Sequence, residues 1–279
     1  MAGGVEMKLV LSLFTGAGLL DQAFREAGFC VVSAGDIIYG QDVREFKTSA
    51  GHFAGVIGGS PCQDYSGMKR NKGTYSDEMI REYVRIVKEA QPDWCLLENV
   101  AAVPDVKIKG YQWQRLDINQ GWYSDVSRLR HIQFFRKSGD MLNIPRGKMQ
   151  KINYGCALAS DNRSFSELLY LQGLPDNYDL PDFTVAGKKK MIGNEVPLVI
   201  GRVLAQEVAR VTDQAFKTVT LQHDNSVTNR DKNAVTGPGV KTVTFCRCGC
   251  SRELTGRKQY FDSSCRKRAQ RRRKKDGVG

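Results

Sequence analysis

A cysteine and a glutamate each follow an apolar segment of this sequence. Cys62 lies in a Gly-Gly-Ser-Pro-Cys-Gln turn after residues 54–57, and Glu98 follows residues 93–97, which are apolar after Asp93. Because the carboxyl ends of parallel strands meet at one edge of a sheet, we expect the thiol and the carboxyl group to lie close together. A thiolate can add to an electron-poor pyrimidine ring while a carboxylic acid forms a hydrogen bond with a ring nitrogen. The two residues therefore predict nucleophilic activation of a pyrimidine.

The surrounding segments alternate between strand-like and helix-like patterns. Strands are predicted over residues 8–14, 30–33, 54–57 and 93–97, and helices over residues 18–28 and 76–90. This alternation is typical of a doubly wound α/β fold, in which ligands bind beyond the carboxyl ends of the strands. Phe14 and Asp36 are expected at the same edge as Cys62 and Glu98.

Five short motifs follow one another along the chain. They are Leu-Phe-Thr-Gly-Ala-Gly at 13–18, Pro-Cys-Gln at 61–63, Glu-Asn-Val at 98–100, Leu-Gln-Gly-Leu-Pro-Asp at 171–176 and Ile-Gly-Asn-Glu-Val-Pro at 192–197. Together they resemble the motifs of the DNA (cytosine-5) methyltransferase family, from about residue 8 to about residue 210. One such motif is weak evidence, whereas five in order are strong evidence. The resemblance implies a Rossmann-like S-adenosylmethionine-dependent methyltransferase fold.

S-adenosylmethionine is the cofactor that this resemblance implies. Phe14 would lie against the adenine, Asp36 would accept hydrogen bonds from the ribose hydroxyls, and Asp42 would contact the adenine amino group. Asp36 stands where the family more often has Glu, so a turn or capping role is the alternative. The full set implied for the cofactor is Phe14, Gly16, Gly18, Leu19, Asp36, Ile37, Asp42, Val43, Pro61, Asn194 and Val196.

The resemblance also assigns catalytic roles. Cys62 would add to C6 of cytosine, Glu98 would be the acid near N3 and the exocyclic amine, and Asn99 would brace the loop. Arg130 would lie beside the thiolate and the pyrimidine carbonyl oxygen, with Arg128 on the same strand face. The alternatives are an inert buried thiol, an exposed Glu-Asn turn and a pair of surface cations flanking Asp125.

Two residues depart from the family pattern. Val126 stands where the family has Gln before the two arginines, which puts the role of that position in bracing the loop in doubt. Glu195 stands where the family has a small residue after Gly-Asn. Its side chain either points outward or lies near the ammonium group of the cofactor, and the sequence does not decide between these.

Residues 137–187 occupy the place of the family's target-recognition region and are few. Because a short segment presents few side chains to a DNA groove, we expect a short or degenerate target sequence. The candidate contacts are Arg146, Lys148, Lys151 and Arg163, with a solvated loop as the alternative for each.

Positive charge is concentrated after residue 240. The chain has 42 basic and 30 acidic residues, and residues 241–279 hold 13 of the basic and 3 of the acidic ones. The first 240 residues therefore hold 29 basic (42 − 13) and 27 acidic (30 − 3) residues. A nearly neutral body with a basic end indicates that attraction to a polyanion such as double-stranded DNA belongs to the tail.

Four cysteines in the tail predict a structural Zn²⁺ site. Cys246, Cys248, Cys250 and Cys265 lie in a segment that resembles a small zinc-ribbon or treble-clef-like finger with a basic helix. Four thiolates suffice for a tetrahedral zinc site, although the spacing lacks paired Cys-x-x-Cys knuckles. A disordered basic tail with free thiols is the alternative. Cys30 and Cys95 lie in apolar runs, and we expect no disulfides and a reducing compartment.

The sequence therefore predicts five regions. Residues 1–136 and 188–212 form the catalytic domain, 137–187 the short recognition region, 213–242 a linker and 243–279 the zinc-finger-like module. The leading function is methyl transfer to C5 of cytosine in DNA, through a covalent Cys62–C6 intermediate and a flipped base. A non-catalytic DNA-binding protein and a tRNA cytosine-5 methyltransferase are the alternatives. We expect a cytoplasmic monomer with no membrane segment, bound to the nucleoid when on DNA, and a restriction enzyme partner remains open.

Overall fold

The computed structural model describes residues 9–65, 73–144, 146–212, 244–245 and 253–254. The chain divides into two compact units, Met1–Thr220 and Leu221–Gly279. In the second unit the described residues form one antiparallel pair, β9 (Thr244–Phe245) with β10 (Glu253–Leu254).

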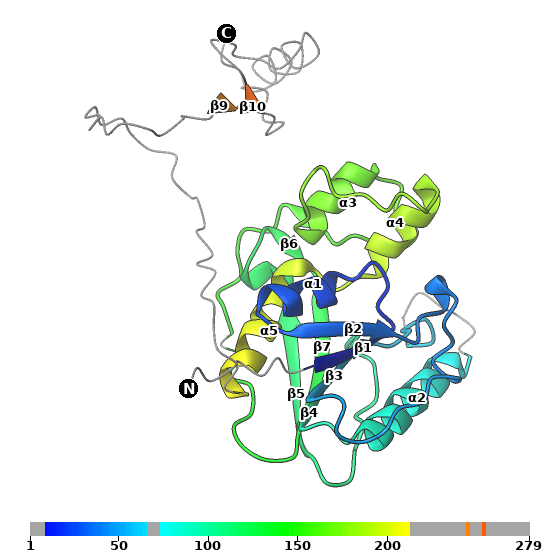
Figure 1. Ribbon diagram of the computed structural model, residues 1–279. Helices are drawn as coiled ribbons and strands as arrows, with labels where there is room; N and C mark the ends of the chain where they lie inside the picture. The colour runs from blue at the N-terminus through cyan, green and yellow to red at the C-terminus, as the bar shows by residue number, and fades with distance from the viewer. Residues whose placement is uncertain (1–8, 66–72, 145, 213–243, 246–252, 255–279) are drawn as a thin grey trace, which may run out of the picture. The chain divides into compact units, whose positions relative to one another are not determined.

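A mixed six-stranded sheet forms the centre of the first unit (Figure 1). Its strands are β1 (Leu9–Leu13), β2 (Cys30–Ala34), β3 (Gly55–Gly59), β4 (Trp94–Asn99), β5 (Gln112–Asn119) and β7 (Leu129–Arg136). The order is β2-β1-β3-β4-β7-β5, in which the first four strands are parallel and β7 is antiparallel to both of its neighbours. The predicted doubly wound fold is confirmed for the parallel strands β1 to β4, and the antiparallel pair β5–β7 extends their sheet.

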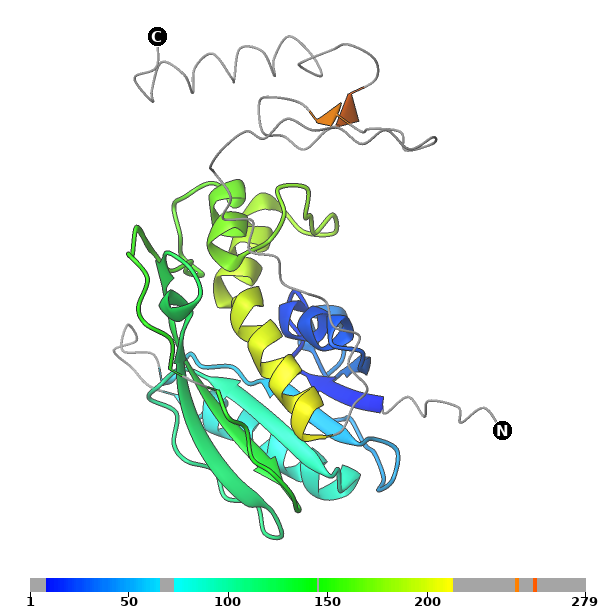
Figure 2. The ribbon, with the colours of Figure 1, turned by 90° about the vertical axis from the view of Figure 1, so that its left-hand side faces the viewer.

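Helices cover both faces of this sheet (Figures 1 and 2). Helices α1 (Leu19–Glu26) and α5 (Leu198–Val211) pack together on one face, and α2 (Tyr75–Ala90) lies on the other. Successive strand residues point to opposite faces, so Val10 joins the core under α1 and α5, while Leu11 joins the core under α2. The near-continuous apolar runs of β1, β3 and β4 are explained by burial on both faces.

The recognition region contains more regular structure than its sequence indicates. It holds β8 (Tyr154–Gly155), which pairs with β6 (Val126–Ser127), and α3 (Phe165–Gln172). A capping box starts α3, since Ser164 and Glu167 each accept a hydrogen bond from the other residue's backbone N–H. Helix α4 (Val185–Asn194) packs on α3 and crosses the boundary that we placed at residue 187. Two short 3₁₀ turns, η1 (Ile37–Tyr39) and η2 (Gln120–Trp122), complete the unit.

A polar side chain ties these two helices together. Gln172, at the end of α3, donates through Nε2 to the carbonyl oxygens of Ile192 and Glu195. The two late sequence motifs therefore meet at the end of α4. Among the described residues, no helix is both long enough and apolar enough to span a bilayer.

Candidate active site

A cavity of about 350 Å³ lies beyond the carboxyl ends of β1, β2, β3 and β4. It brings together twelve of the residues expected from the sequence: Phe14, Gly16, Asp36, Ile37, Asp42, Val43, Pro61, Cys62, Glu98, Asn99, Arg130 and Asn194. The other expected residues of the described part, Gly18, Leu19, Val196 and Arg128, lie outside its lining. Leu19, the first residue of α1, and Val196 are instead buried in the hydrophobic core.

Cys62 is half-buried at the cavity wall. Burial raises the pKa of its thiol, the nearby Glu98 carboxyl group raises it further, and Arg130 acts in the opposite direction. Cys62 lines the cavity and belongs to neither hydrophobic core cluster. A cation near the sulfur is the group that favours the thiolate here.

Glu98 is buried at the end of β4. Its Oε1 lies 2.8 Å from Nε of Arg130, yet this ion pair lacks hydrogen-bond geometry and Oε1 has no hydrogen-bond donor among the described residues. Burial raises the pKa of the carboxyl group, and Arg130 and Arg128 partly oppose that shift. A buried carboxyl group that lines a cavity and has a raised pKa is suited to exchange a hydrogen bond with a ligand.

Asn99 fixes the loop that carries Cys62. Its Nδ2 donates to the carbonyl oxygen of Ser60 at 3.1 Å and to the Ser60 hydroxyl at 2.9 Å. Its Oδ1 accepts from the backbone N–H of Val100 at 2.8 Å. The side chain thus links the loops after β3 and β4, and this contact agrees with the bracing role expected for it.

Arg128 and Arg130 are both buried, so the alternative of a surface pair is wrong. Arg130 faces Glu98, whereas Arg128 donates to the carbonyl oxygens of Ala157 at 2.5 Å and Gly193 at 2.8 Å. Burial lowers the pKa of Arg128 to about 9. Arg128 therefore connects the recognition region to α4, whereas Arg130 lines the cavity.

The loop after β1 has an unusual backbone. Phe14 has φ +56° and Gly16 has φ +58°, both in the left-handed region. Asp36 holds this loop, since its Oδ2 accepts from Gly16 N–H at 2.7 Å and its Oδ1 accepts from Ile38 N–H at 2.9 Å. Asp36 therefore caps η1, as the alternative proposed, and lines the cavity as well.

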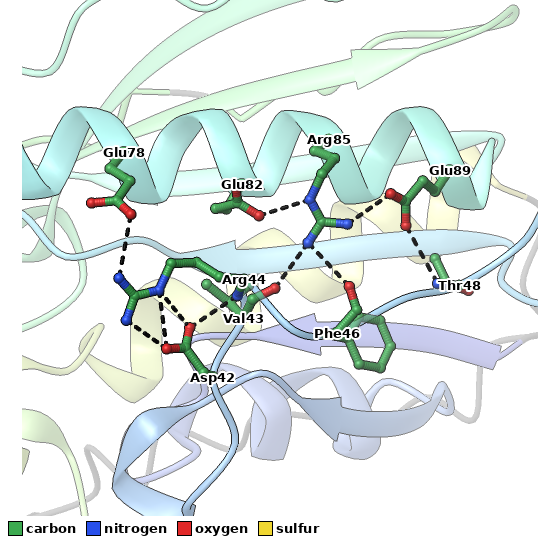
Figure 3. A network of polar contacts seen from close by, with 9 residues as sticks. All are labelled: Asp42, Val43, Arg44, Phe46, Thr48, Glu78, Glu82, Arg85 and Glu89. Atoms are coloured by element: carbon green, nitrogen blue, oxygen red, sulfur yellow. Dashed lines mark hydrogen bonds and ion pairs between the residues drawn. The ribbon is translucent and has the colours of Figure 1, made fainter.

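Asp42 is less free than its expected role requires. Figure 3 shows Arg44 pairing with both Asp42 oxygens and reaching Glu78 on α2. This salt bridge occupies much of the acceptor capacity that an adenine amino group would use. Val43 beside it is buried and offers the cavity an apolar wall.

Figure 3 also shows Arg85, a second cation, which holds the segment around Val43 from the side of α2. Arg85 on α2 donates through Nη2 to the carbonyl oxygens of Val43 at 2.9 Å and Phe46 at 3.0 Å. Its other nitrogens pair with Glu82 and Glu89 at 2.7 Å each. The position of Val43 thus depends on a helix residue that no sequence motif indicated.

Glu195 points inward, so the outward orientation considered from the sequence is wrong. The residue is buried, and its carboxylate accepts from the backbone N–H groups of Ala17 at 2.6 Å and Leu19 at 3.3 Å. Burial raises the pKa of Glu195 to about 8, with the two backbone hydrogen bonds opposing the shift. Lys190 and Glu195 both line the cavity, and no role was assigned to Lys190 from the sequence.

The recognition candidates differ in their surroundings. Arg163 is engaged by Asp161 at 2.5 Å and donates to the carbonyl oxygens of Gly155 and Cys156. It therefore holds its own loop together. Arg146, Lys148 and Lys151 are exposed.

Known proteins resemble the chain in sequence. The family profile described as C-5 cytosine-specific DNA methylase matches residues 33–116. The type II methyltransferase M.HgiGI of Herpetosiphon aurantiacus is 32% identical over 113 residues, covering 32% of this chain and 88% of that protein. The chain belongs to the C-5 cytosine-specific DNA methylase family.

Other similarities to this methylase family are narrower. The type II methyltransferase M.FnuDI of Fusobacterium nucleatum is 37% identical over 112 residues, and the chain spans about a third of its length, 32%. The S. pombe Dnmt2 methyltransferase aligns with a TM-score of 0.55 over 74% of this chain and 98% of that chain, at 11% identity. At that identity the likeness shows the fold, which is the mixed α/β methyltransferase fold.

The tail predictions of this methylase-family chain lie outside the described residues. Cys246, Cys248, Cys250 and Cys265 are not described, and within the described ranges no group of three His, Cys, Asp or Glu side chains could hold a metal ion. Cys30, Cys62, Cys95 and Cys156 are free thiols.

Proposed function

We propose that this protein is a DNA cytosine-5 methyltransferase that uses S-adenosylmethionine. One observation carries the proposal: the Cys62 thiol and the Glu98 and Arg130 side chains line the same cavity as the loop after β1. Methyl transfer to a base requires the nucleophile, the acid and the cofactor loop to share one space.

The lining residues fit the cofactor. The cavity volume of about 350 Å³ is within the range of small-molecule sites. Phe14 and Val43 offer apolar surface for a base, and Asp36 offers carboxylate oxygens for hydroxyl groups. S-adenosylmethionine, when bound, supplies an electrophilic methyl group.

The protein's own groups then account for the activation of the base. The Cys62 thiolate bonds to C6 of cytosine, and Glu98 hydrogen-bonds at N3 as electron density moves toward C5. C5 would then accept the methyl group as the bond between the methyl carbon and the cofactor's sulfonium sulfur breaks, which leaves a neutral thioether. Loss of the C5 proton to water, with return of the electron pair of the bond between C6 and the Cys62 sulfur to that sulfur, would restore the ring and the thiolate. Because Cys62 lies in a cavity, the cytosine must leave the duplex stack to reach it.

Duplex DNA containing 5-fluorocytosine tests this chemistry directly. Fluorine at C5 blocks the final elimination, so the protein with cofactor should form a stable covalent adduct visible as a shifted band. Cys62→Ser should form none, whereas Cys30→Ser, which removes a thiol from β2 outside the cavity lining, should form it as the unchanged protein does. Glu98→Gln should slow single-turnover methylation of ordinary DNA by about 10² or more, since the amide cannot donate a carboxylic proton.

Other outcomes would change the assignment. Adduct formation by Cys62→Ser would refute the nucleophile. Methylation of tRNA without methylation of duplex DNA would support the RNA-directed alternative, and binding of DNA without any transfer would support the non-catalytic one.

A further inference from the structure

The N-terminus of α1 already holds a carboxyl group that belongs to the protein. Glu195, at the end of α4, accepts hydrogen bonds from Ala17 N–H at 2.6 Å and Leu19 N–H at 3.3 Å. Backbone N–H groups at a helix N-terminus favour negative charge and serve ligand anions in many proteins. Here a side chain 178 residues away in sequence occupies that position.

Gly16 leaves the space for this carboxylate. A Cβ atom at position 16 would stand 2.0 Å from Oε1 of Glu195. The absence of a side chain at Gly16 therefore lets the Glu195 carboxyl group lie against the backbone of this loop.

The carboxyl group of Glu195 can still accept hydrogen bonds from a ligand. Each oxygen accepts one backbone hydrogen bond and retains a further lone-pair position. Glu195 lines the main cavity with Asn194 and Lys190. It also lines, with Asp21 and Glu98, an adjoining cavity of about 40 Å³. The end of the cavity nearest α1 is thus lined by carboxyl groups, and a ligand cation placed there would favour the ionised form of Glu195.

We propose that Glu195 is a specificity-determining residue for the amino-acid end of the cofactor, accepting a hydrogen bond from its α-ammonium group. The α-carboxylate of the ligand then lies away from α1, toward the exposed cation Lys190. This assignment rests on the proposed use of S-adenosylmethionine. It differs from a purely structural helix cap, because a cap makes no distinction between ligands with and without an amino group.

Three ligands separate these roles in equilibrium binding by calorimetry, with no turnover needed. They are S-adenosylhomocysteine, its analogue without the α-amino group and its analogue without the α-carboxylate. A charge-assisted hydrogen bond corresponds to a loss of about 10- to 100-fold in affinity. Glu195→Gln should weaken binding of the two amine-bearing ligands by that factor and leave binding of the deaminated analogue within about twofold.

Glu167→Gln is the matched control. Glu167 also accepts a backbone N–H at a helix start but lies on α3 outside the cavity lining, so its replacement should change none of the three affinities. An equal loss for all three ligands in Glu195→Gln would reduce Glu195 to a helix cap, and no loss for any would also overturn the assignment. An unchanged protein that binds none of the ligands would overturn the proposed function itself, and the assignment with it.

Discussion

Stability against pH offers an independent measure of the buried Glu195 carboxyl group. Its pKa is raised to about 8 in the folded protein from an ordinary value of 4.5, chiefly because burial disfavours the charge. The folded state therefore holds a proton that the unfolded state releases between pH 4.5 and about 8. Unfolding free energy should fall as pH rises through this window, because the unfolded state binds fewer protons.

The expected magnitude follows from the shift. Each pKa unit corresponds to about 1.4 kcal/mol, so the protein should lose about 3 kcal/mol through this group between pH 5.5 and pH 8.0. Glu195→Gln cannot titrate, and the difference between the two proteins should change by that amount. Nearby Asp21 and Glu98 titrate in both proteins, so their contributions largely cancel in the difference.

Urea unfolding followed by tryptophan fluorescence suits this measurement. Trp94, Trp113 and Trp122 are the three tryptophans of the chain, and all lie in the unit that contains Glu195. Glu167→Gln again serves as the control, because hydrogen bonds from Ser164 lower the pKa of that exposed carboxyl group. A difference between unchanged protein and Glu195→Gln that stays flat from pH 5.5 to 8.0 would refute the reasoning.

Two further predictions concern the cavity wall at Val43 and the basic tail after residue 240. Arg85→Met removes both hydrogen bonds to the Val43 and Phe46 carbonyl oxygens, so calorimetry should show binding of S-adenosylhomocysteine weakened several-fold. Glu82→Gln removes only an ion pair with Arg85. If it weakened binding of S-adenosylhomocysteine as much as Arg85→Met does, the idea that Arg85 positions the Val43 wall of the cavity would be wrong. Deleting residues 241–279 removes ten net positive charges (13 − 3), and each lost phosphate contact should lower the slope of log affinity against log salt by about 0.9. A slope of log affinity against log salt that is unchanged by the deletion would assign the tail another role. Metal analysis should find about one zinc per chain in the full protein and none in the truncated one.

The parallel half of the fold is predictable from sequence because its signals are local. β1, β3 and β4 are largely apolar runs, of which β3 ends at Gly59 and β4 at Asn99, and burial on both faces keeps them apolar. The antiparallel β5–β7 pair carries no such signal. Its strands mix charged and apolar residues, and β5 lies at the edge of the sheet, so only the distant pairing defines it.

The arginines show how spacing can mislead. Arg128 and Arg130 are two residues apart, which predicts a shared strand face. In the structure β7 begins at Leu129, so Arg128 precedes the strand and turns to backbone carbonyls of the recognition region and α4. The resemblance to the methyltransferase family made both arginines catalytic candidates, while the start of the strand decided which one reaches Glu98.

Glu195 was unpredictable for a different reason. Its orientation depends on two N–H groups at the start of α1, and no local pattern near residue 195 refers to them. Gln172 links these parts, since its amide donates to the carbonyl oxygen of Glu195 while the Glu195 side chain reaches Ala17. The motif at 171–176 therefore supports the motif at 192–197, which in turn contacts the motif at 13–18. A substitution at Gln172 would therefore alter the position of Glu195 and, through it, the loop after β1, although Gln172 itself lies outside the cavity lining.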